Sequence, residues 1–506
     1  MKLSDRSRIN NSVRNILFGA LGYGLSSMFS FIMRTVIIYR FGVEYVGINS
    51  LFASVLQVLN LSELGFSTTI AYALYKPIAK NDIERICSII SFYRKAYRFI
   101  GLFIFCVGVL LCPFIENIIN GTYPSEINIH VIFLLLLVNT SISYWFFGYK
   151  SVVFFAYQRN DMLSKTKLAS SLLMYVLQTI ALIIIEDYYA YIVCMIVGTL
   201  VNNFLLEYNS KRMFPEIKPC GKLSKNDIIK LFKKIGTLFG HQLDVVIITS
   251  TDNIIISAYL GLNVLATYGN YSVVINVAIS VLIMIAHSFA ASIGDSLATD
   301  SKEKNYKDFI NFSYMFINLS GICAILMFIM FQDFMTLWMG EDMLLDNKLV
   351  FLLCFCFFVR MAKRPGNTYK VEQGLWDSDM LKPYIAGLVN LGFNIITVNY
   401  IGLYGVVIST IISLGVIEKQ WETFVLFRSY FNGGVKKYIL MQLHSVIKLL
   451  IIGCLTYKIS TLLPVTNVLL FLLKLLLIVV IVVGIFILSS IKDKEYRYMI
   501  SKLKTL

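Results

Sequence analysis

Residues 466–490 read TNVLLFLLKLLLIVVIVVGIFILSS, an apolar stretch interrupted by a single charge, Lys474. A helix of about 20 apolar residues is long enough to cross the hydrocarbon core of a bilayer. Polar and apolar residues do not alternate along the stretch, so it does not resemble a strand of a membrane barrel. Because lipid offers no partners to backbone polar groups, the stretch predicts a transmembrane helix.

The rest of the chain repeats this character. Similar apolar stretches lie near 15–41, 43–75, 99–116, 130–157, 166–185, 189–208, 235–260, 262–291, 309–332, 349–376, 382–399, 402–427 and 438–458. Hydrophobic residues make up 57% of the chain and charged residues only 15%, against about 25% charged residues in a soluble domain. We therefore predict an all-α integral membrane protein with about fourteen transmembrane helices.

The formal net charge of +15 describes membrane topology and does not predict a nucleic-acid partner. If both termini are cytoplasmic, most of the 45 Lys and Arg residues fall in inner loops, whereas Lys348 and Lys458 fall in outer ones. This bias predicts a multi-pass protein of a cell membrane. The nine cysteines lie singly, without the spacing of zinc ligands, so neither a disulfide framework, a metal site nor a cofactor is predicted.

An internal repeat recurs at an offset of about 219 residues. Residues 42–47, GVEYVG, correspond to residues 261–266, GLNVLA, and the triplet Asp161-Met162-Leu163 recurs as Asp379-Met380-Leu381. Since six predicted helices lie within each repeat, the two halves keep the same orientation in the membrane. They are then related by a pseudo-twofold axis along the membrane normal.

The repeat predicts how the chain is divided. The segments are an N-lobe of six helices over 1–208, a basic cytoplasmic linker over 209–234, a C-lobe of six helices over 235–430, and a C-terminal helix pair with a basic tail over 431–506. The linker is predicted to lie against anionic lipids of the cytoplasmic leaflet.

Three segments around the second predicted helix carry a family resemblance: LFASVL at 51–56, LNLSELGF at 59–66 and ALYKPIA at 73–79. With Arg360 and Pro365 in the predicted tenth helix, they resemble Wzx-type polysaccharide flippases. These belong to the multidrug/oligosaccharidyl-lipid/polysaccharide exporter superfamily, which includes MATE exporters and the lipid II flippase MurJ. The resemblance implies a MATE-like fold of two lobes.

The resemblance also implies a function. Such proteins move undecaprenyl-diphosphate-linked oligosaccharides across the bacterial cytoplasmic membrane by alternating access, for assembly of capsule, O-antigen (lipopolysaccharide) or exopolysaccharide. Glycosyltransferases and a polysaccharide polymerase are the implied functional partners.

Two other functions stay open at this point. A cation-coupled small-molecule exporter of the MATE type would share the fold but needs acidic residues in its cavity. A membrane glycosyltransferase or polymerase needs a large extramembrane loop with acidic or metal-binding residues, and the predicted outer loops are short. No Walker motif occurs. We therefore expect a transporter and not an enzyme.

Charges inside the predicted spans are candidates for the transport site, because each costs at least about 2.5–3.5 kcal/mol near the bilayer centre. Arg360, Lys363 and Arg364 lie roughly 16–22 Å from the outer end of the predicted tenth helix. An Arg fork suits the oxygens of a lipid diphosphate. The alternative is that the helix ends earlier and the three cations are ordinary loop charges. Lys150, in the predicted fourth helix, either meets the same headgroup or extends to the interface.

Four further charged residues are candidates for ion coupling or for a gate, because of their positions in the predicted helices. Glu63 and Asp244 are candidate carboxylates for ion coupling, or else lie near the cytoplasmic mouth, where charges cost little. Arg34 and Asp252 stand at matching positions near the outer ends of the first helix of each lobe, at depths that agree within about 1.5 Å. Their pairing would compensate both charges and form an outer gate. The alternative is that Arg34 extends to the outer surface.

Overall fold

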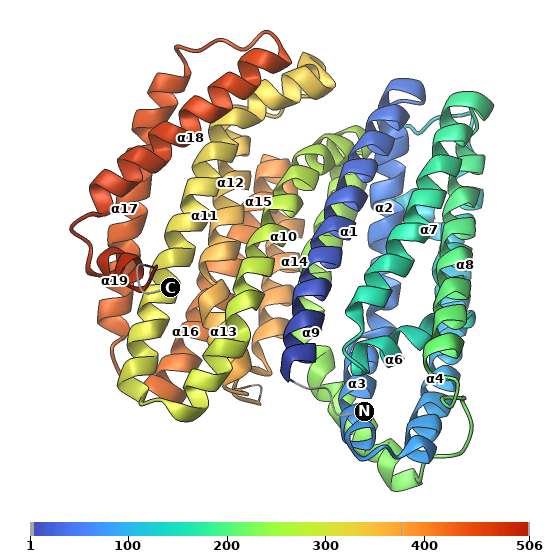
Figure 1. Ribbon diagram of the computed structural model, residues 1–506. Helices are drawn as coiled ribbons and strands as arrows, with labels where there is room; N and C mark the ends of the chain where they lie inside the picture. The colour runs from blue at the N-terminus through green and yellow to red at the C-terminus, as the bar shows by residue number, and fades with distance from the viewer. Residues whose placement is uncertain (1–4, 376, 504–506) are drawn as a thin grey trace. The chain divides into compact units, whose positions relative to one another are not determined.

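The chain forms two compact units, Met1–Ala266 and Thr267–Leu506. A computed structural model describes residues 5–375 and 377–503, except for the side chains of 5–21, 23, 237, 238, 241, 242, 244, 245, 377, 502 and 503. Within these ranges all regular secondary structure is helical (Figure 1).

Unit 1 holds the first nine α-helices, coloured blue to green in Figure 1. They are α1 (Asp5–Arg40), α2 (Val43–Leu59), α3 (Phe66–Lys80), α4 (Ile83–Leu111), α5 (Ile129–Trp145), α6 (Ser151–Ala156), α7 (Asn160–Ile180), α8 (Tyr188–Met213) and α9 (Lys225–Leu260). Helix α7 packs between α1 and α8, and α9 packs along α2. The predicted division of the chain into lobes and linker stays a prediction.

Helix α10 (Leu262–Thr299) leads into unit 2. The other helices of that unit are α11 (Lys302–Met339), α12 (Asn347–Ala362), α13 (Arg364–Glu372), α14 (Lys382–Ile401), α15 (Leu403–Ile412), α16 (Lys419–Leu426), α17 (Val435–Ser460), α18 (Val468–Ser490) and α19 (Lys494–Leu503). Helix α11 is central, because α12, α17 and α18 all pack against it.

The bounds of the helices repeat at the offset that the sequence predicts. Helices α5 and α12 begin at Ile129 and Asn347, about 218 residues apart. Gly42 follows α1 and Gly261 follows α9, with φ angles of 111° and 87°. Only glycine adopts these angles without strain, so the matched segments 42–47 and 261–266 encode the same sharp turn between two helices. The predicted repeat is confirmed at the level of helix bounds.

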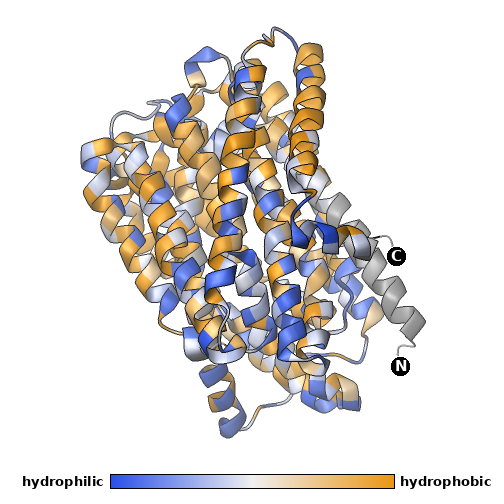
Figure 2. Ribbon diagram, turned by 90° about the vertical axis from the view of Figure 1, so that its left-hand side faces the viewer, coloured by the Kyte–Doolittle hydropathy of each residue, from blue (hydrophilic) through white to orange (hydrophobic). Residues whose placement is uncertain are grey.

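Ten helices of the described residues are long and apolar enough to cross a membrane, or eleven if α5 and α6 count as one bent span. Hydrophobic residues cover much of the length of the helices in Figure 2. The predicted count of fourteen is not confirmed. The remaining predicted spans form α1, α9 and α12–α13; among the residues whose side chains are described, α9 has the apolar stretch Val246–Leu260, and α12 ends at Ala362.

Two buried lysines attach the C-terminal helix pair to α11. In α17, Lys448 Nζ lies 2.7 Å from Asp493 Oδ2 and 3.0 Å from the hydroxyl of Tyr314 in α11. In α18, Lys474 Nζ lies 2.7 Å from Oδ2 of Asp333 in α11. Each lysine side chain is 8% exposed. Because a buried ammonium is stable only when it is paired, these contacts fix how α17 and α18 pack.

Candidate functional site

Both halves of the chain break a helix where the sequence predicts a continuous one. The predicted span over 130–157 forms α5 and α6, which are bent by 48°. The predicted span over 349–376 forms α12 and α13, with Pro365 in the first turn of α13. Proline has no backbone N–H to continue the preceding helix, but it fits the first turn of a new one. The predicted tenth helix is therefore interrupted at Lys363, and the chain continues as a second helix, α13, and not as a loop.

Four buried charges form a series of ion pairs beside the break in unit 2. Asp379 pairs with Lys370 and lies 3.4 Å from Lys382 Nζ, which in turn lies 2.7 Å from Glu422 Oε1. No side chain of the four is more than 5% exposed. Charges this far from water are stable when they neutralise one another, which two lysines and two carboxylates can do. We call these four residues, together with Lys363 and Glu418, the charge network.

The remaining pair of the charge network links the break to α16. Lys363, between α12 and α13, pairs with Glu418, which ends a π-helical turn just before α16. Both side chains are largely buried. A carboxylate of the protein thus neutralises one of the three cations predicted to face a substrate. The role of Lys363 in substrate binding stays a prediction.

Arg364 begins α13 and has a contact that reaches α10. Its Nη2 lies 3.4 Å from Nε2 of His287 in α10. Its Nε is buried and has no hydrogen-bond partner among the described residues. Arg360, one turn earlier in α12, is partly buried. A buried donor without a partner costs about 1–3 kcal/mol, so an anion that reached Arg364 would recover that energy.

Three carboxylate oxygens of the charge network also lack hydrogen-bond partners within the described ranges. They are Oδ1 of Asp379, Oε1 of Glu418 and Oε2 of Glu422. An ionised carboxylate only accepts hydrogen bonds, so a proton or a small cation would satisfy such oxygens. The network therefore holds these helices together and leaves three acceptor oxygens unused among the described residues.

Lys150 occupies the corresponding break in unit 1. It ends the short turn Gly148–Lys150 between α5 and α6, and it is 3% exposed. Its Nζ lies 3.5 Å from Glu207 Oε2 and 3.4 Å from Ser210 Oγ, both in α8. Lys150 is thus buried within the protein and paired with Glu207. Its contact with a substrate headgroup stays a prediction.

Glu63 lies in a different setting, among hydroxyl groups. It ends the turn between α2 and α3 and accepts hydrogen bonds from Ser67 and Tyr97. Ser67 Oγ lies 2.8 Å from the hydroxyl of Tyr93 and also lines a cavity of about 210 Å³. No cation forms an ion pair with Glu63 in the part of the chain that the structure describes. A carboxylate held only by hydroxyl groups suits the uptake of a proton or a hard cation.

The predicted gate residues both lie in unit 1. Arg34 Nη2 donates a hydrogen bond of 2.9 Å to the carbonyl oxygen of Ala266. Asp252 is buried, with 4% of its surface exposed. The pairing of Arg34 with Asp252 stays a prediction. The side chain of Asp244, the second predicted coupling carboxylate, lies outside the described residues.

The gate makes a testable prediction about charge reversal. Arg34→Asp and Asp252→Arg should each abolish transport, because each places two like charges together in the membrane. The double variant should recover transport, because it again places one positive and one negative charge at these two positions, with the charges exchanged. Arg40→Asp is the matched control, because Arg40 and Glu186 are largely exposed and such pairs contribute about 0–1 kcal/mol. A double variant no better than either single, at equal abundance, would rule out the gate.

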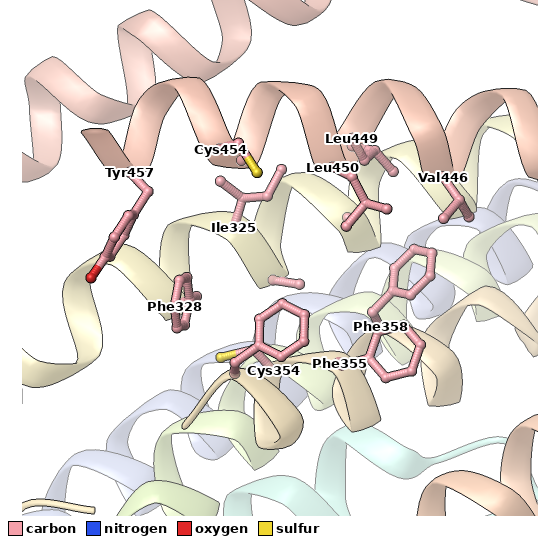
Figure 3. A pocket seen from close by; sticks show the side chains of 14 residues that line it. Ile325, Phe328, Cys354, Phe355, Phe358, Val446, Leu449, Leu450, Cys454 and Tyr457 are labelled. Atoms are coloured by element: carbon pink, nitrogen blue, oxygen red, sulfur yellow. The ribbon is translucent and has the colours of Figure 1, made fainter. Parts of the chain in front are cut away.

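Unit 2 also holds an apolar cavity of about 190 Å³ between α11, α12 and α17 (Figure 3). Phe328, Phe355 and Phe358 line it together with aliphatic side chains such as Leu450. Apart from Tyr457, the lining residues are hydrophobic, glycine or cysteine. The chemistry of this cavity suits a hydrocarbon chain.

Sequence reasoning missed the acidic half of the charge network. Glu418 and Glu422 stand four residues apart, which places them on one helix face, and the repeat had marked Asp379 only as a partner of Asp161. Asp161 is fully buried as well, with Oδ1 3.0 Å from Arg159 Nε. The sequence did contain one signal of the network: the carboxylate of Asp161 recurs in the repeat as Asp379, and basic residues stand near both.

Comparison with solved structures shows which fold these elements form. MurJ, a lipid II flippase, matches in its inward closed conformation with a TM-score of 0.69, at 15% identity over 94% of this chain and 99% of MurJ. An inward-facing multidrug resistance MATE family transporter of the MOP superfamily matches with a TM-score of 0.65, at 14% identity over 80% of this chain and 94% of that one. At such low identity the likeness shows the fold alone, which is the predicted MATE-like fold of a multi-pass membrane protein.

A third similar structure is that of a Vibrio cholerae MATE transporter, with a TM-score of 0.58 and 12% identity over 84% of this chain and 96% of that one. No curated protein has a matching sequence. The sequence profile described as "Polysaccharide biosynthesis protein" matches residues 12–293, which is more than half of the chain. The helical membrane fold and this match agree with the family resemblance of the sequence, and the protein therefore belongs to the polysaccharide biosynthesis protein family.

Proposed function

We propose that this protein is a flippase that moves undecaprenyl-diphosphate-linked oligosaccharides across the bacterial cytoplasmic membrane by alternating access. Its products would serve capsule, O-antigen or exopolysaccharide assembly. Glycosyltransferases would supply the substrate on the cytoplasmic side, and a polymerase would consume it on the other. Membership of a polysaccharide biosynthesis family and the fold of a lipid II flippase support this proposal.

The observation that carries the proposal is the buried Nε of the Arg364 guanidinium, which lacks a hydrogen-bond partner among the described residues. The neighbouring Lys363, in contrast, is already neutralised by Glu418. A diphosphate supplies acceptor oxygens and about two negative charges, which suit one planar arginine fork. The apolar cavity of about 190 Å³ on the same unit suits part of a polyprenyl chain.

A cation-coupled exporter of small molecules is the second candidate. Two observations favour it: the hydroxyl setting of Glu63, and the carboxylate oxygens of the charge network that lack partners. Either group is able to take up a proton or a small cation during transport. A glycosyltransferase or polymerase activity is less well supported, because the three similar structures compared above are described as transporters or flippases.

Reconstitution distinguishes the two candidates. The purified protein is placed in liposomes that contain a fluorescent undecaprenyl-diphosphate oligosaccharide, and a membrane-impermeant quencher reports its arrival in the outer leaflet. A flippase should accelerate quenching over protein-free liposomes. Cation-driven efflux of a small dye without any acceleration of quenching would favour the exporter and contradict the proposal.

The proposed orientation makes a separate prediction. In a variant lacking the native cysteines, single cysteines at positions 125 and 343 should react with an impermeant reagent added outside the cell. Cysteines at positions 220 and 505 should be spared, because the basic segments belong on the cytoplasmic side. Labelling of both 220 and 505 from outside would overturn the orientation.

A further inference from the structure

A polar cavity of about 570 Å³ lies in unit 1, at the end of α3 and the beginnings of α4 and α9. Five basic side chains line it: Lys76, Lys80, Arg85, Lys230 and Lys234. Four of them are exposed, so the cavity opens to the aqueous side that the charge bias predicts to be cytoplasmic. It lies apart in the chain from Arg364 and from the charge network.

The two acidic residues of this cavity already have partners. Asp82 caps α4 by accepting a hydrogen bond of 2.9 Å from the backbone N–H of Arg85. Asp227 Oδ2 lies 2.8 Å from a guanidinium nitrogen of Arg85 and 2.5 Å from Ser224 Oγ. The hydrogen bond from Ser224, aided by Arg85, holds the pKa of Asp227 below its usual value, so Asp227 stays ionised. One carboxylate is thus bound to the single arginine.

The lysines of the cavity therefore carry positive charge in excess. Within the described ranges no carboxylate forms an ion pair with Lys76, Lys80 or Lys230. Lys234 lies over the ring of Tyr72, with its Nζ 5.1 Å from the ring centroid. Like charges gathered around one cavity repel each other, and a bound anion would relieve that repulsion.

Two helix N-termini add to this field. Helix α4 begins at Ile83 and α9 at Lys225, and first-turn residues of both helices line the cavity. Asp82 and Ser224 cap the two helices by accepting hydrogen bonds from the N–H groups of Arg85 and Asp227, and the helix dipole favours an anion near these ends. Phosphate groups bind at such positions when charged side chains assist.

The surface beside the cavity is apolar and aromatic. Tyr72 and Tyr75 on α3 are 51% and 39% exposed, and Ile229 on α9 is 66% exposed. Tyrosines concentrate at the level of lipid headgroups, and a basic helix with exposed apolar residues lies in the same layer. The cavity therefore opens where lipid headgroups are found, not far out in solvent.

We propose that this cavity binds the phosphate-bearing headgroup of a membrane lipid, with about two negative charges, at the predicted cytoplasmic face. The lysines supply the charge, the two helix dipoles add to it, and the aromatic surface receives the first part of the lipid chain. This site is distinct from Arg364, and the effect of substitutions in the cavity, not probe binding alone, separates it from the proposed flippase function. A soluble nucleoside diphosphate offers the same chemistry, and the test separates the two sources.

The test measures binding to the full-length protein in a neutral detergent by titration calorimetry. The probes are farnesyl diphosphate for a lipid source, uridine diphosphate for a soluble source, and inorganic pyrophosphate for the anion alone. The Lys80→Gln/Lys230→Gln variant should bind farnesyl diphosphate at least about tenfold more weakly, because charge-assisted contacts are lost. The matched control is Lys436→Gln/Lys437→Gln, which removes the same charge from exposed residues of α17.

Each outcome bears on the proposal. The lipid site is supported if the protein binds farnesyl diphosphate more tightly than pyrophosphate and uridine diphosphate. The cavity variant, and not the control variant, should weaken that binding. Uridine diphosphate as the tightest ligand would overturn the lipid assignment in favour of a soluble nucleotide. No binding of any probe, or equal weakening by the control variant, would overturn the site itself. All four substituted lysines are exposed, so unchanged circular dichroism should confirm that both variants fold.

Discussion

Glycan export should be lost when Arg364 is replaced by alanine, while the amount of protein in the membrane stays unchanged. Arg364 has a buried Nε without a partner, so its removal deletes no hydrogen bond from that atom in the resting protein. It does delete the donor that the proposed diphosphate would engage. Arg364→Lys should also be impaired, because lysine keeps the charge but cannot offer two parallel N–H groups. Export is measured as surface polysaccharide in a strain that depends on the protein.

The controls for this prediction come from the same unit. Arg428 is exposed, and its guanidinium carbon lies 5.5 Å from the ring centroid of Phe424, so Arg428→Ala removes an arginine without touching the site. That variant should export normally. Full export by the double variant Arg360→Ala/Arg364→Ala would remove both arginines from the mechanism.

The charge network should dominate the stability of unit 2. Lys382→Met leaves Glu422 and Asp379 without a shared partner in a setting where both carboxylates are almost fully buried. Breaking a buried ion pair from one side costs about 3–5 kcal/mol, so the melting temperature in detergent should fall clearly. Lys304→Met, which breaks an exposed pair with Asp300, should cost no more than about 1 kcal/mol.

A double variant tests the physical reason for that loss. Lys382→Met/Glu422→Leu removes one positive and one negative charge and leaves Lys370 paired with Asp379. Replacement of a buried ion pair by apolar side chains is often neutral, so the double variant should be more stable than Lys382→Met alone. Equal melting temperatures for Lys382→Met and Lys304→Met would show that the network contributes no special stability.

The sequence predicted the helical membrane fold and its repeat because both depend on local patterns. Apolar length indicates a span, and a glycine such as Gly42 or Gly261 marks a turn that other residues cannot adopt. The breaks in the predicted fourth and tenth helices were less visible. Pro365 signals one of them, whereas the other turns at Phe147, which has a φ of 54°, and the glycine that follows it, Gly148, was not recognised as a signal.

Partners of charged residues could not be predicted in the same way. Lys150 and Glu207 are distant in sequence and meet only because α8 packs near the break between α5 and α6. Glu418 and Glu422 fell in a segment that hydropathy had assigned to the end of a span, where charges cost little. Their burial follows from packing against α13 and α14, which depends on tertiary structure.

The attachment of α18 to α11 has a consequence for how the chain is made. Asp333 and Lys474 are 141 residues apart in sequence. At about 5–20 residues per second, a ribosome needs roughly 7–28 s to add the second partner after the first. During that interval the nascent α11 holds a carboxylate whose partner ammonium has not yet been made. The contact that joins α11 to α18 is thus completed only from the C-terminal end of the chain, and a chain terminated before Lys474 lacks it.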